Sequence, residues 1–272
     1  MLNAPPNPNG RPNSDVVRPW VNATDLTRRL RGMHIIDFGV DRTEQEAALY
    51  ELPFEYIRQH VYPARSQNRR EGRRDSWWLH GETYPTMRKR LSALSRYIIT
   101  PRVSKYRVFC WENPRTLPDS ATCVFAREDD CFFGVLQSRA QEIWARAQGT
   151  QLREVESGFR YTPKSIFQTF PFPWPPGSEP QDSPLVEAIA DAARELVAKR
   201  DAWLNPTGTS AEELKARTLT NLYNARPAWL ADAHRKLDEA VFAAYGWPPT
   251  FTDAELLKHL LALNHQRAVI HD

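Results

Sequence analysis

The composition of the chain changes at residues 96–111, RYIITPRVSKYRVFCW. β-Branched and aromatic residues dominate 96–100 and 105–111, and such residues favour strands. The short apolar runs ATCVF (121–125) and FFGVL (132–136) predict two more strands, and the polar–apolar alternation over 153–161 predicts another. We therefore expect this central part of the chain to carry small sheets.

Helical patterns lie on both sides of these strands. Upstream, a capping box at Thr43–Glu46 opens a predicted helix, and 85–94 has a second helical pattern. A third predicted helix covers 138–147. From Ser183 onward every predicted element is a helix, with further capping boxes at Ser210–Glu213 and Thr252–Glu255. The expected fold class is α+β, a mixed α/β domain followed by a small all-α segment.

The Pro-rich stretch FPFPWPPG (170–177) separates these two regions, because alternating prolines cannot continue a helix or sit in the centre of a sheet. We expect it to be a packed strap. The predicted domains are a lead-in at 1–60, a mixed domain at 61–177 and a helical segment at 178–272. Within them we expect Trp77 and Trp78 in the core and Asp129–Asp130 in a turn.

The composition describes an ordinary globular protein. The 272 residues are 41% hydrophobic and 25% charged, which excludes a disordered chain. No run of about 20 apolar residues is present, so no membrane span is expected, and the N-terminus lacks the apolar segment of a secretory signal. Three cysteines without C-x-x-C spacing argue against a disulfide framework or a zinc site, and favour a reducing, cytoplasmic location.

Positive charge is concentrated in one stretch of the chain. The net charge is only +3, but residues 61–110 contain 12 Lys or Arg and three acids. Such a stripe, interleaved with aromatic residues, is typical of surfaces that follow nucleic-acid phosphates. The residues that we expect to contact the DNA backbone are Arg65, Arg69, Arg70, Arg73, Arg74, Arg88, Lys89, Arg90, Arg102, Ser104, Lys105 and Arg107. The alternative is a solvated charged surface without a ligand.

Catalytic motifs are missing from the sequence. Dinucleotide-binding, P-loop and nucleophile-elbow patterns are absent, and the seven histidines show no metal-ligand spacing. Glu213-Leu-Lys215 has the E-x-K of a nuclease metal site but lacks the preceding P-D, and no [DNS]-P-P-[YFW] methyltransferase tetrapeptide occurs. We expect no catalytic residue, no metal site and no cofactor in this chain.

Three stretches nevertheless resemble the C-terminal half of class I SAM-dependent, adenine-specific DNA methyltransferases, including the fused type IIL and type IIG restriction–modification enzymes. The first is GRPNSDVVRPW (10–20) with IIDFG (35–39). The second is RYIITPRVSKYR (96–107), continuing to FFGVL (132–136) and TPKSIFQTFPFPW (162–174). The third is LTNLYN (219–224) with Trp229, Ala233–His234 and Leu237–Asp238. Together they cover nearly the whole chain.

The resemblance implies that 61–177 is a target recognition domain, 178–272 a C-terminal helical segment and 1–60 the connector from a methyltransferase core. In the family, the SAM-binding glycine motif and the N-P-P-[YF] tetrapeptide precede these stretches. We therefore expect an excised domain or a truncated reading frame of a bacterial enzyme. The expected partners are double-stranded DNA and a methyltransferase catalytic domain joined in cis, with S-adenosylmethionine as the cofactor of that parent enzyme.

Base reading is assigned to the segment that precedes the Pro-rich strap. If 153–161 is extended, Glu154, Glu156 and Arg160 share one face. A carboxylate can accept from cytosine N4, and an arginine can donate twice to guanine. The predicted base readers are Glu154, Glu156, Arg160 and Lys164, whereas the alternative is an exposed strand edge with ordinary alternating charge.

Two other functions stay open at this point. The basic stripe would also suit a protein-interaction or scaffold module that binds an acidic partner. The Trp and Tyr residues would suit an RNA-binding module that stacks single-stranded bases.

Overall fold

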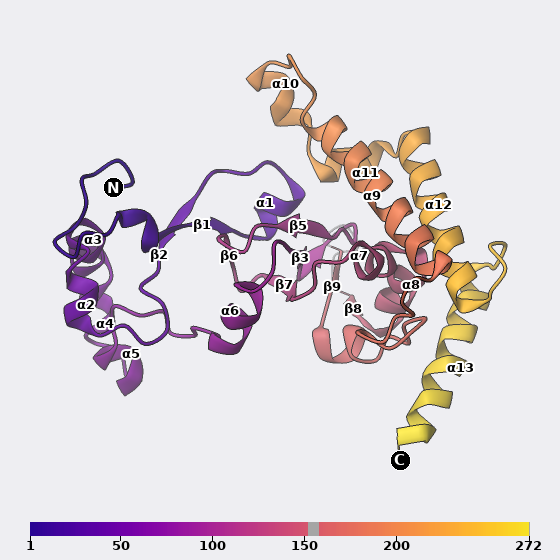
Figure 1. Ribbon diagram of the computed structural model, residues 1–272, viewed down its shortest axis with the longest axis horizontal. Coiled ribbons are helices and arrows are strands. Elements are labelled where there is room, and N and C mark those ends of the chain that lie inside the picture. Colours follow the sequence, from indigo (N-terminus) through magenta and orange to yellow (C-terminus); the bar gives the residue numbers. More distant parts are fainter. Residues whose placement is uncertain (152–157, 272) are drawn as a thin grey trace. The chain divides into compact units, whose positions relative to one another are not determined.

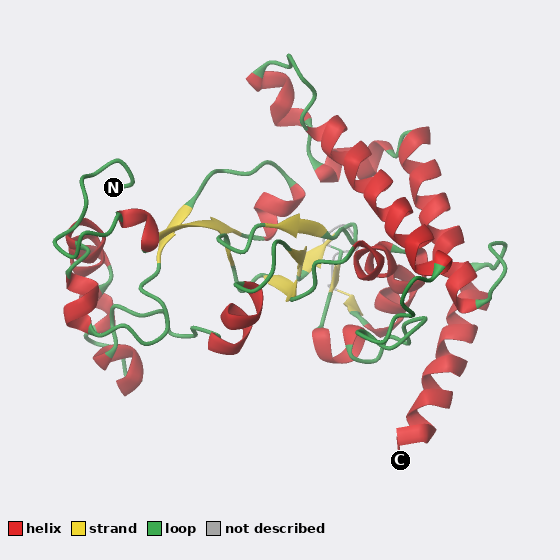
Figure 2. Cartoon of the chain, viewed as in Figure 1, coloured by secondary structure: helices red, strands yellow, loops and turns green. Residues whose placement is uncertain are grey.

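A computed structural model describes residues 1–151 and 158–271 and divides them into two compact units. Unit 1 comprises Met1–Val21, Arg31–Arg96 and Asn113–Asp119, and unit 2 comprises Asn22–Leu30, Tyr97–Glu112 and Ser120–Asp272. Figure 1 labels the elements, and Figure 2 distinguishes helices from strands. The chain crosses between the units several times, so these units do not follow the expected boundaries after residues 60 and 177.

Unit 1 is a small three-stranded sheet with short helices. Strand β1 (Val17–Val21) pairs antiparallel with β2 (His34–Ile36) and parallel with β6 (Leu117–Pro118). The helices are η1 (Asn13–Asp15), α2 (Glu44–Ala48), α3 (Glu51–His60), α4 (Tyr62–Arg65), α5 (Glu71–Asp75) and α6 (Pro85–Leu91).

Aromatic residues build the core of unit 1. Phe38, which follows β2, contacts the rings of Tyr50 and Phe54 at centroid distances of 6.3 and 6.2 Å. Phe54 in turn contacts Trp77 at 5.3 Å, and Trp77 is only 6% exposed. The neighbouring Trp78 packs against the same cluster, so both tryptophans serve the core as expected.

Unit 2 contains two three-stranded sheets. In one, β3 (Tyr97–Pro101) lies between β5 (Cys110–Glu112) and β7 (Thr122–Phe125), antiparallel to both. In the other, β9 (Phe159–Arg160) lies between β4 (Val103–Ser104) and β8 (Thr150–Gln151), again antiparallel. The strands expected at 96–100 and 121–125 are confirmed, whereas only the end of 105–111 is strand.

The rest of unit 2 is helical. These elements are α1 (Ala23–Thr27), α7 (Asp130–Gln137), α8 (Arg139–Gln148), the π-helix η3 (Pro163–Phe167), α9 (Pro184–Leu204), α10 (Ala211–Ala216), α11 (Leu219–Ala225), α12 (Ala228–Tyr245) and α13 (Asp253–His271). The expected α+β class, with an all-helical C-terminal part, is therefore confirmed.

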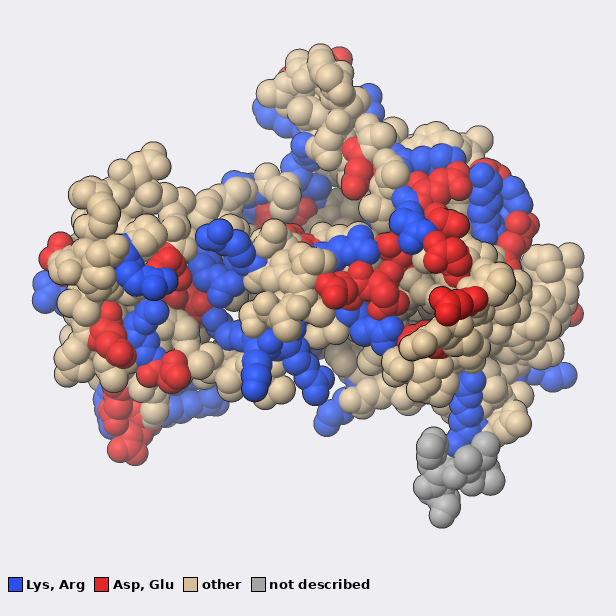
Figure 3. Space-filling view, viewed as in Figure 1, with Lys and Arg blue, Asp and Glu red and all other residues tan. Residues whose placement is uncertain are grey.

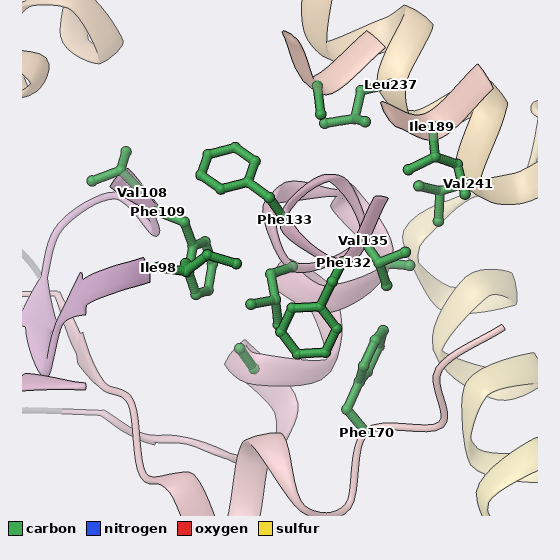
Figure 4. Packing of buried hydrophobic residues seen from close by; sticks show 14 of the residues in the cluster. Ile98, Val108, Phe109, Phe132, Phe133, Val135, Phe170, Ile189, Leu237 and Val241 are labelled. Atoms are coloured by element: carbon green, nitrogen blue, oxygen red, sulfur yellow. The ribbon is translucent and has the colours of Figure 1, made fainter. Parts of the chain in front are cut away.

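Helix α7 forms the centre of the unit 2 core. Ile98 and Phe109 of the sheet region lie on one side of it, and Ile189 of α9 lies on another (Figure 4). A Cβ at Gly134 of α7 would lie 2.6 Å from Cγ2 of Ile189, closer than real Cβ contacts. Glycine at this position therefore allows α7 and α9 to pack tightly.

The strand expected over 132–136 is wrong, because these residues lie in α7. A short apolar run suits a buried helix as well as a buried strand, and periodicity alone does not distinguish them. The deciding signal is Asp129, whose Oδ1 accepts the N–H of Phe132 at 2.8 Å and caps the helix. The expected turn at Asp129–Asp130 is thus a helix start.

The Pro-rich strap is held by the C-terminal helices. Phe170 and Phe172 are each 5% exposed and insert into the core. Tyr245 of α12 donates to the carbonyl of Pro171 at 2.8 Å, and Arg267 of α13 donates to the carbonyls of Phe172 and Pro173. Side chains thus satisfy the backbone that prolines keep out of regular structure. No helix within 1–151 and 158–271 is long and apolar enough to cross a membrane.

Candidate nucleic-acid interface

Unit 1 carries a group of exposed cations that have no acidic partner. None of them forms an ion pair with a carboxylate in the described part of the chain, and α6 presents two of them to solvent. The group consists of Arg69, Arg70, Lys89 and Arg90. Figure 3 shows Lys and Arg side chains projecting from the part of unit 1 around α6. Charges left unpaired in this way remain available to phosphate.

The other cations of this segment are partly engaged within unit 1. Arg74 pairs with Asp75 at 3.1 Å, and both side chains are exposed. Arg73 approaches Glu82 only to 4.0 Å. Arg65 is half-buried and forms no ion pair among the residues that the structure describes.

Arg88 is committed to a buried carboxylate. Its Nη1 donates to Oδ2 of Asp37 at 2.6 Å, and its Nε donates to the carbonyl of Thr83. Asp37 also lies 3.5 Å from Arg18 and 3.8 Å from His80. Arg88 therefore ties the start of α6 to the loop after β2, whereas Lys89 and Arg90 stay free.

The pKa values of this cluster follow from burial and charge. Burial alone would raise the pKa of Asp37, but hydrogen bonding and charge from Arg88 more than offset it, so the pKa lies below its usual range. Burial lowers the pKa of His80, and the cations Arg88 and Arg65 lower it further against the attraction of Asp37. At neutral pH the cluster is thus an ionised carboxylate with two guanidinium groups and a neutral imidazole.

In unit 2, Arg102 and Lys105 are exposed as expected. Nε of Arg102 donates to the carbonyl of Thr122 at 3.2 Å. Nζ of Lys105 donates to Oδ1 of Asn224 at 2.9 Å. Both keep their charge at the surface, without a carboxylate partner in the described residues.

Arg107 corrects the sequence-based expectation, because it is 3% exposed and faces the interior. Its guanidinium donates to Thr100 Oγ1 at 3.1 Å, to the carbonyl of Pro101 and to the carbonyl of Phe159 at 3.4 Å. The rings of Phe159 and Tyr161 lie 4.8 and 4.9 Å from it. Burial lowers the pKa of Arg107 to about 10. Arg107 therefore joins the two sheets of unit 2 and is unavailable to a phosphate.

Ser104 also serves the fold. It is 9% exposed, and its Oγ donates to the carbonyl of Tyr106 at 2.6 Å. The backbone around Ser104 approaches Gly158 so closely that a Cβ there would lie 2.0 Å from the Ser104 carbonyl oxygen. Gly158 also has φ +81°, so glycine is required for β9 to pair with β4. The assignment of Ser104 to phosphate is corrected.

Of the predicted base readers, the structure describes two. Arg160 is exposed in β9, opposite Val103 of β4 and Thr150 of β8, while its neighbours Phe159 and Tyr161 are buried. Lys164 is exposed in η3. Neither pairs with a carboxylate of the described residues. Glu154 and Glu156 lie outside the described residues.

A second buried guanidinium, on Arg200 of α9, had no signal in the sequence. It is 3% exposed and donates to the carbonyl of Phe109 at 2.8 Å and to Oε1 of Gln137 at 3.2 Å. The residue stands within an ordinary charged helical pattern, so only packing reveals that it joins α9 to α7 and to the segment before β5. The Asp37 cluster was missed for a similar reason, although an acid inside the apolar run HIIDF was a usable signal.

The described residues contain no group of three or more His, Cys, Asp or Glu that could hold a metal ion. The exposed Lys and Arg side chains described above can bind an anion and orient it.

Comparison with known proteins gives a family-model match to the C-terminal helices. Residues 183–269 match the model of the MmeI C-terminal domain. No curated protein matches the chain, whereas 17 chains of solved structures do. One of these is the Type IIL restriction-modification enzyme MmeI, solved in complex with DNA.

The likeness to MmeI extends over nearly all of this chain. It covers 94% of the residues at a TM-score of 0.68 and 19% sequence identity. The chain spans only 32% of the MmeI chain. The two findings confirm the resemblance to the C-terminal portion of a type IIL restriction–modification enzyme, and at this identity they establish the fold.

Proposed function

We propose that this chain recognises double-stranded DNA on behalf of an adenine-specific methyltransferase or restriction–modification enzyme. The observation that carries the proposal is the set of exposed Lys and Arg residues without acidic partners, on a fold shared with a protein solved in complex with DNA. In this proposal the methyl transfer and its donor, S-adenosylmethionine, belong to a catalytic domain that acts together with the chain.

Contacts divide into those that position and those that read. Arg69, Arg70, Lys89 and Arg90 of unit 1, with Arg102 and Lys105 of unit 2, would contact phosphates and fix the register on the duplex. Arg160 is the reader that we propose, because it projects from a strand whose neighbouring residues are locked in the core. A guanidinium held on such a strand can donate two hydrogen bonds to guanine O6 and N7.

The two tryptophans of the basic stretch do not favour single-stranded RNA. Trp77 is buried in the core of unit 1, and Trp78 donates its indole N–H to the carbonyl of Arg42 at 2.8 Å. Aromatic stacking platforms for single strands need exposed faces. We therefore propose duplex DNA as the ligand.

Selection from a randomised duplex pool tests the proposal. The full chain should enrich one sequence pattern, and its affinity should fall steeply with salt. Arg160→Gln should reduce the preference for one base pair by about tenfold while leaving affinity for random duplex unchanged, since one bidentate contact is worth about 1–3 kcal/mol of discrimination. Lys199→Gln, which removes a charge already paired with Glu195, is the matched control.

Binding without any enriched pattern would reduce the function to non-specific DNA contact. Binding that is insensitive to salt, or none at all, would overturn the proposal and leave the scaffold alternative.

A further inference from the structure

A hollow of about 450 Å³ lies within unit 1, beside helix α5. Cationic side chains dominate its wall. Arg65, Arg70 and Arg73 line it together with His80, and Glu82 is the single acid among its lining residues. The three guanidinium groups and one carboxylate give the hollow a net positive charge, which favours an anion there.

Arg65 carries an unsatisfied donor. Its Nη1 is buried and has no hydrogen-bond partner among the described residues. An unsatisfied buried donor costs on the order of 1–3 kcal/mol, and more when it is charged. Arg65 also lines the hollow and pairs with no carboxylate of the described residues, so its charge is available to a ligand there.

The other two arginines are also open to a ligand. Arg70 is exposed and has no acidic partner in the described part of the chain. Arg73 lies 4.0 Å from Glu82, at the outer limit of an ion pair. Both can therefore turn a guanidinium toward an anion without first breaking a strong contact.

Glycine at position 81 keeps space for one of these groups. A Cβ there would lie 2.8 Å from Nε of Arg73 and 3.1 Å from its Cζ. Gly72, on the same wall, has nothing within 4 Å of its ideal Cβ position. The Arg73 guanidinium thus lies in a place that only the missing side chain at 81 leaves open.

We propose that this hollow seats one phosphate group, bound by Arg65, Arg70 and Arg73. Arginine forks match the oxygens of phosphate, and three of them supply more donors than a single carboxylate could accept. The inference rests on the proposed function, because the phosphate would come from the backbone of duplex DNA. It goes beyond that function in proposing that one phosphate contributes more to binding than the other backbone contacts.

The Gly81→Ala substitution distinguishes a specific phosphate site from a non-specific positive surface, because it alters the site without changing the charge. The added methyl must displace the Arg73 guanidinium, so duplex affinity of the full chain should fall by about threefold to tenfold, within the value of one charge-assisted hydrogen bond. Thermal unfolding of the variant checks that the fold is kept.

A methylphosphonate walk along the duplex locates the phosphate. Neutralising one phosphate at a time should weaken wild-type binding most at a single position. Arg65→Gln should weaken binding by about tenfold and reduce the slope of log affinity against log salt by about 0.9, the value for one phosphate contact. In this variant a methylphosphonate at that one position should have no additional effect on binding. Arg58→Gln removes a cation already paired with Glu55 at 2.7 Å and should keep the sensitivity.

The outcomes distinguish the seat from the general function. If wild-type chain binds duplex but no position couples to Arg65, the phosphate seat is overturned and DNA recognition stands. If duplex does not bind, thermal unfolding in inorganic phosphate against chloride at equal ionic strength decides. Stabilisation of wild type but not of Arg65→Gln would keep the seat with a free phosphate as ligand. Equal behaviour of the two proteins would overturn it.

Discussion

Two neighbouring basic stretches of this chain differ in the solvent exposure of their cationic side chains. Residues 65–90 carry Arg and Lys side chains that mostly remain at the surface of unit 1, several without an acidic partner. Residues 102–107 have a similar composition, yet Arg107 is buried among carbonyls and aromatic rings in unit 2. Equal charge density in sequence thus says little about what each arginine does.

The physical reason is that a guanidinium has two distinct uses. In water it keeps its charge available to a phosphate and is held weakly. In the interior its donors can satisfy several acceptors at once. Arg107 donates to the carbonyls of Pro101 and Phe159, and Arg200 donates to the carbonyl of Phe109 and to Oε1 of Gln137. Substitutions of buried and of exposed cations should therefore have different effects on stability and on DNA binding.

The largest effect is expected at Arg107. Arg107→Ala should lower the free energy of unfolding by about 3–5 kcal/mol, because it leaves the carbonyls of Pro101 and Phe159 unpaired and empties a packed site. Denaturant titration measures the loss. Lys105→Ala, two residues away and exposed, should stay within about 0.5 kcal/mol. Unchanged stability of Arg107→Ala with weakened DNA binding would restore a phosphate role.

The opposite behaviour is expected for the unpaired surface cations. The triple variant Arg69→Gln, Lys89→Gln, Arg90→Gln should keep its stability but flatten the salt dependence of duplex binding by about 2.7 in log–log slope, for three phosphate contacts. The measurement is fluorescence anisotropy over a salt series.

A control for that variant removes three cations that are already paired. Arg146, Lys215 and Arg235 each lie within 2.5–2.8 Å of a carboxylate on their own helix. Changing these three to Gln alters the net charge equally. A slope change as large as that of the first triple variant would show that net charge, and not the unit 1 surface, sets DNA affinity.

A buried acid, Asp238, should make the stability of the protein depend on pH. Burial raises the pKa of Asp238 to about 7, although its Oδ1 accepts the backbone N–H of Arg139 at 2.7 Å. The native state therefore keeps a proton that the unfolded chain releases near pH 4. This contribution to stability is complete below about pH 4 and is lost as pH rises to about 7.

Asp238→Asn should remove this slope. Between pH 4 and 7 the wild type should lose about 2 kcal/mol more than the variant, roughly half of the full value for three pKa units because the side chain is not wholly sealed from solvent. Denaturant titrations at several pH values measure it. Glu239→Gln, which breaks an exposed pair with Arg235, should leave the pH profile unchanged. Parallel profiles for wild type and Asp238→Asn would contradict the raised pKa.

The smallest effect is expected at Ser104. Ser104→Ala should cost about 1 kcal/mol, since the Tyr106 carbonyl loses the hydroxyl that donates to it. Duplex affinity should stay the same, because this hydroxyl faces the backbone of its own turn. A salt-dependent loss of binding without a change in stability would return Ser104 to the phosphate contacts.

Sequence patterns predicted the helices best where end signals were strong. Ser210–Glu213 and Thr43–Glu46 each form the expected capping box. The run at 132–136 failed, because its apolar residues are buried on all sides and so show no period. For the candidate site, the stretch of positive charge could be predicted. That Arg70 is exposed and Arg107 is buried could not.

The α+β class, the helical C-terminal part and the concentration of arginine could be predicted from the sequence, because they follow from local propensity, caps and composition. Tertiary structure alone decided that Arg107 and Arg200 are buried, that Arg88 is bound to Asp37, and that Arg65, Arg70 and Arg73 surround one hollow. The reason is that solvent exposure and partner choice depend on residues distant in sequence, which meet only when the chain has folded.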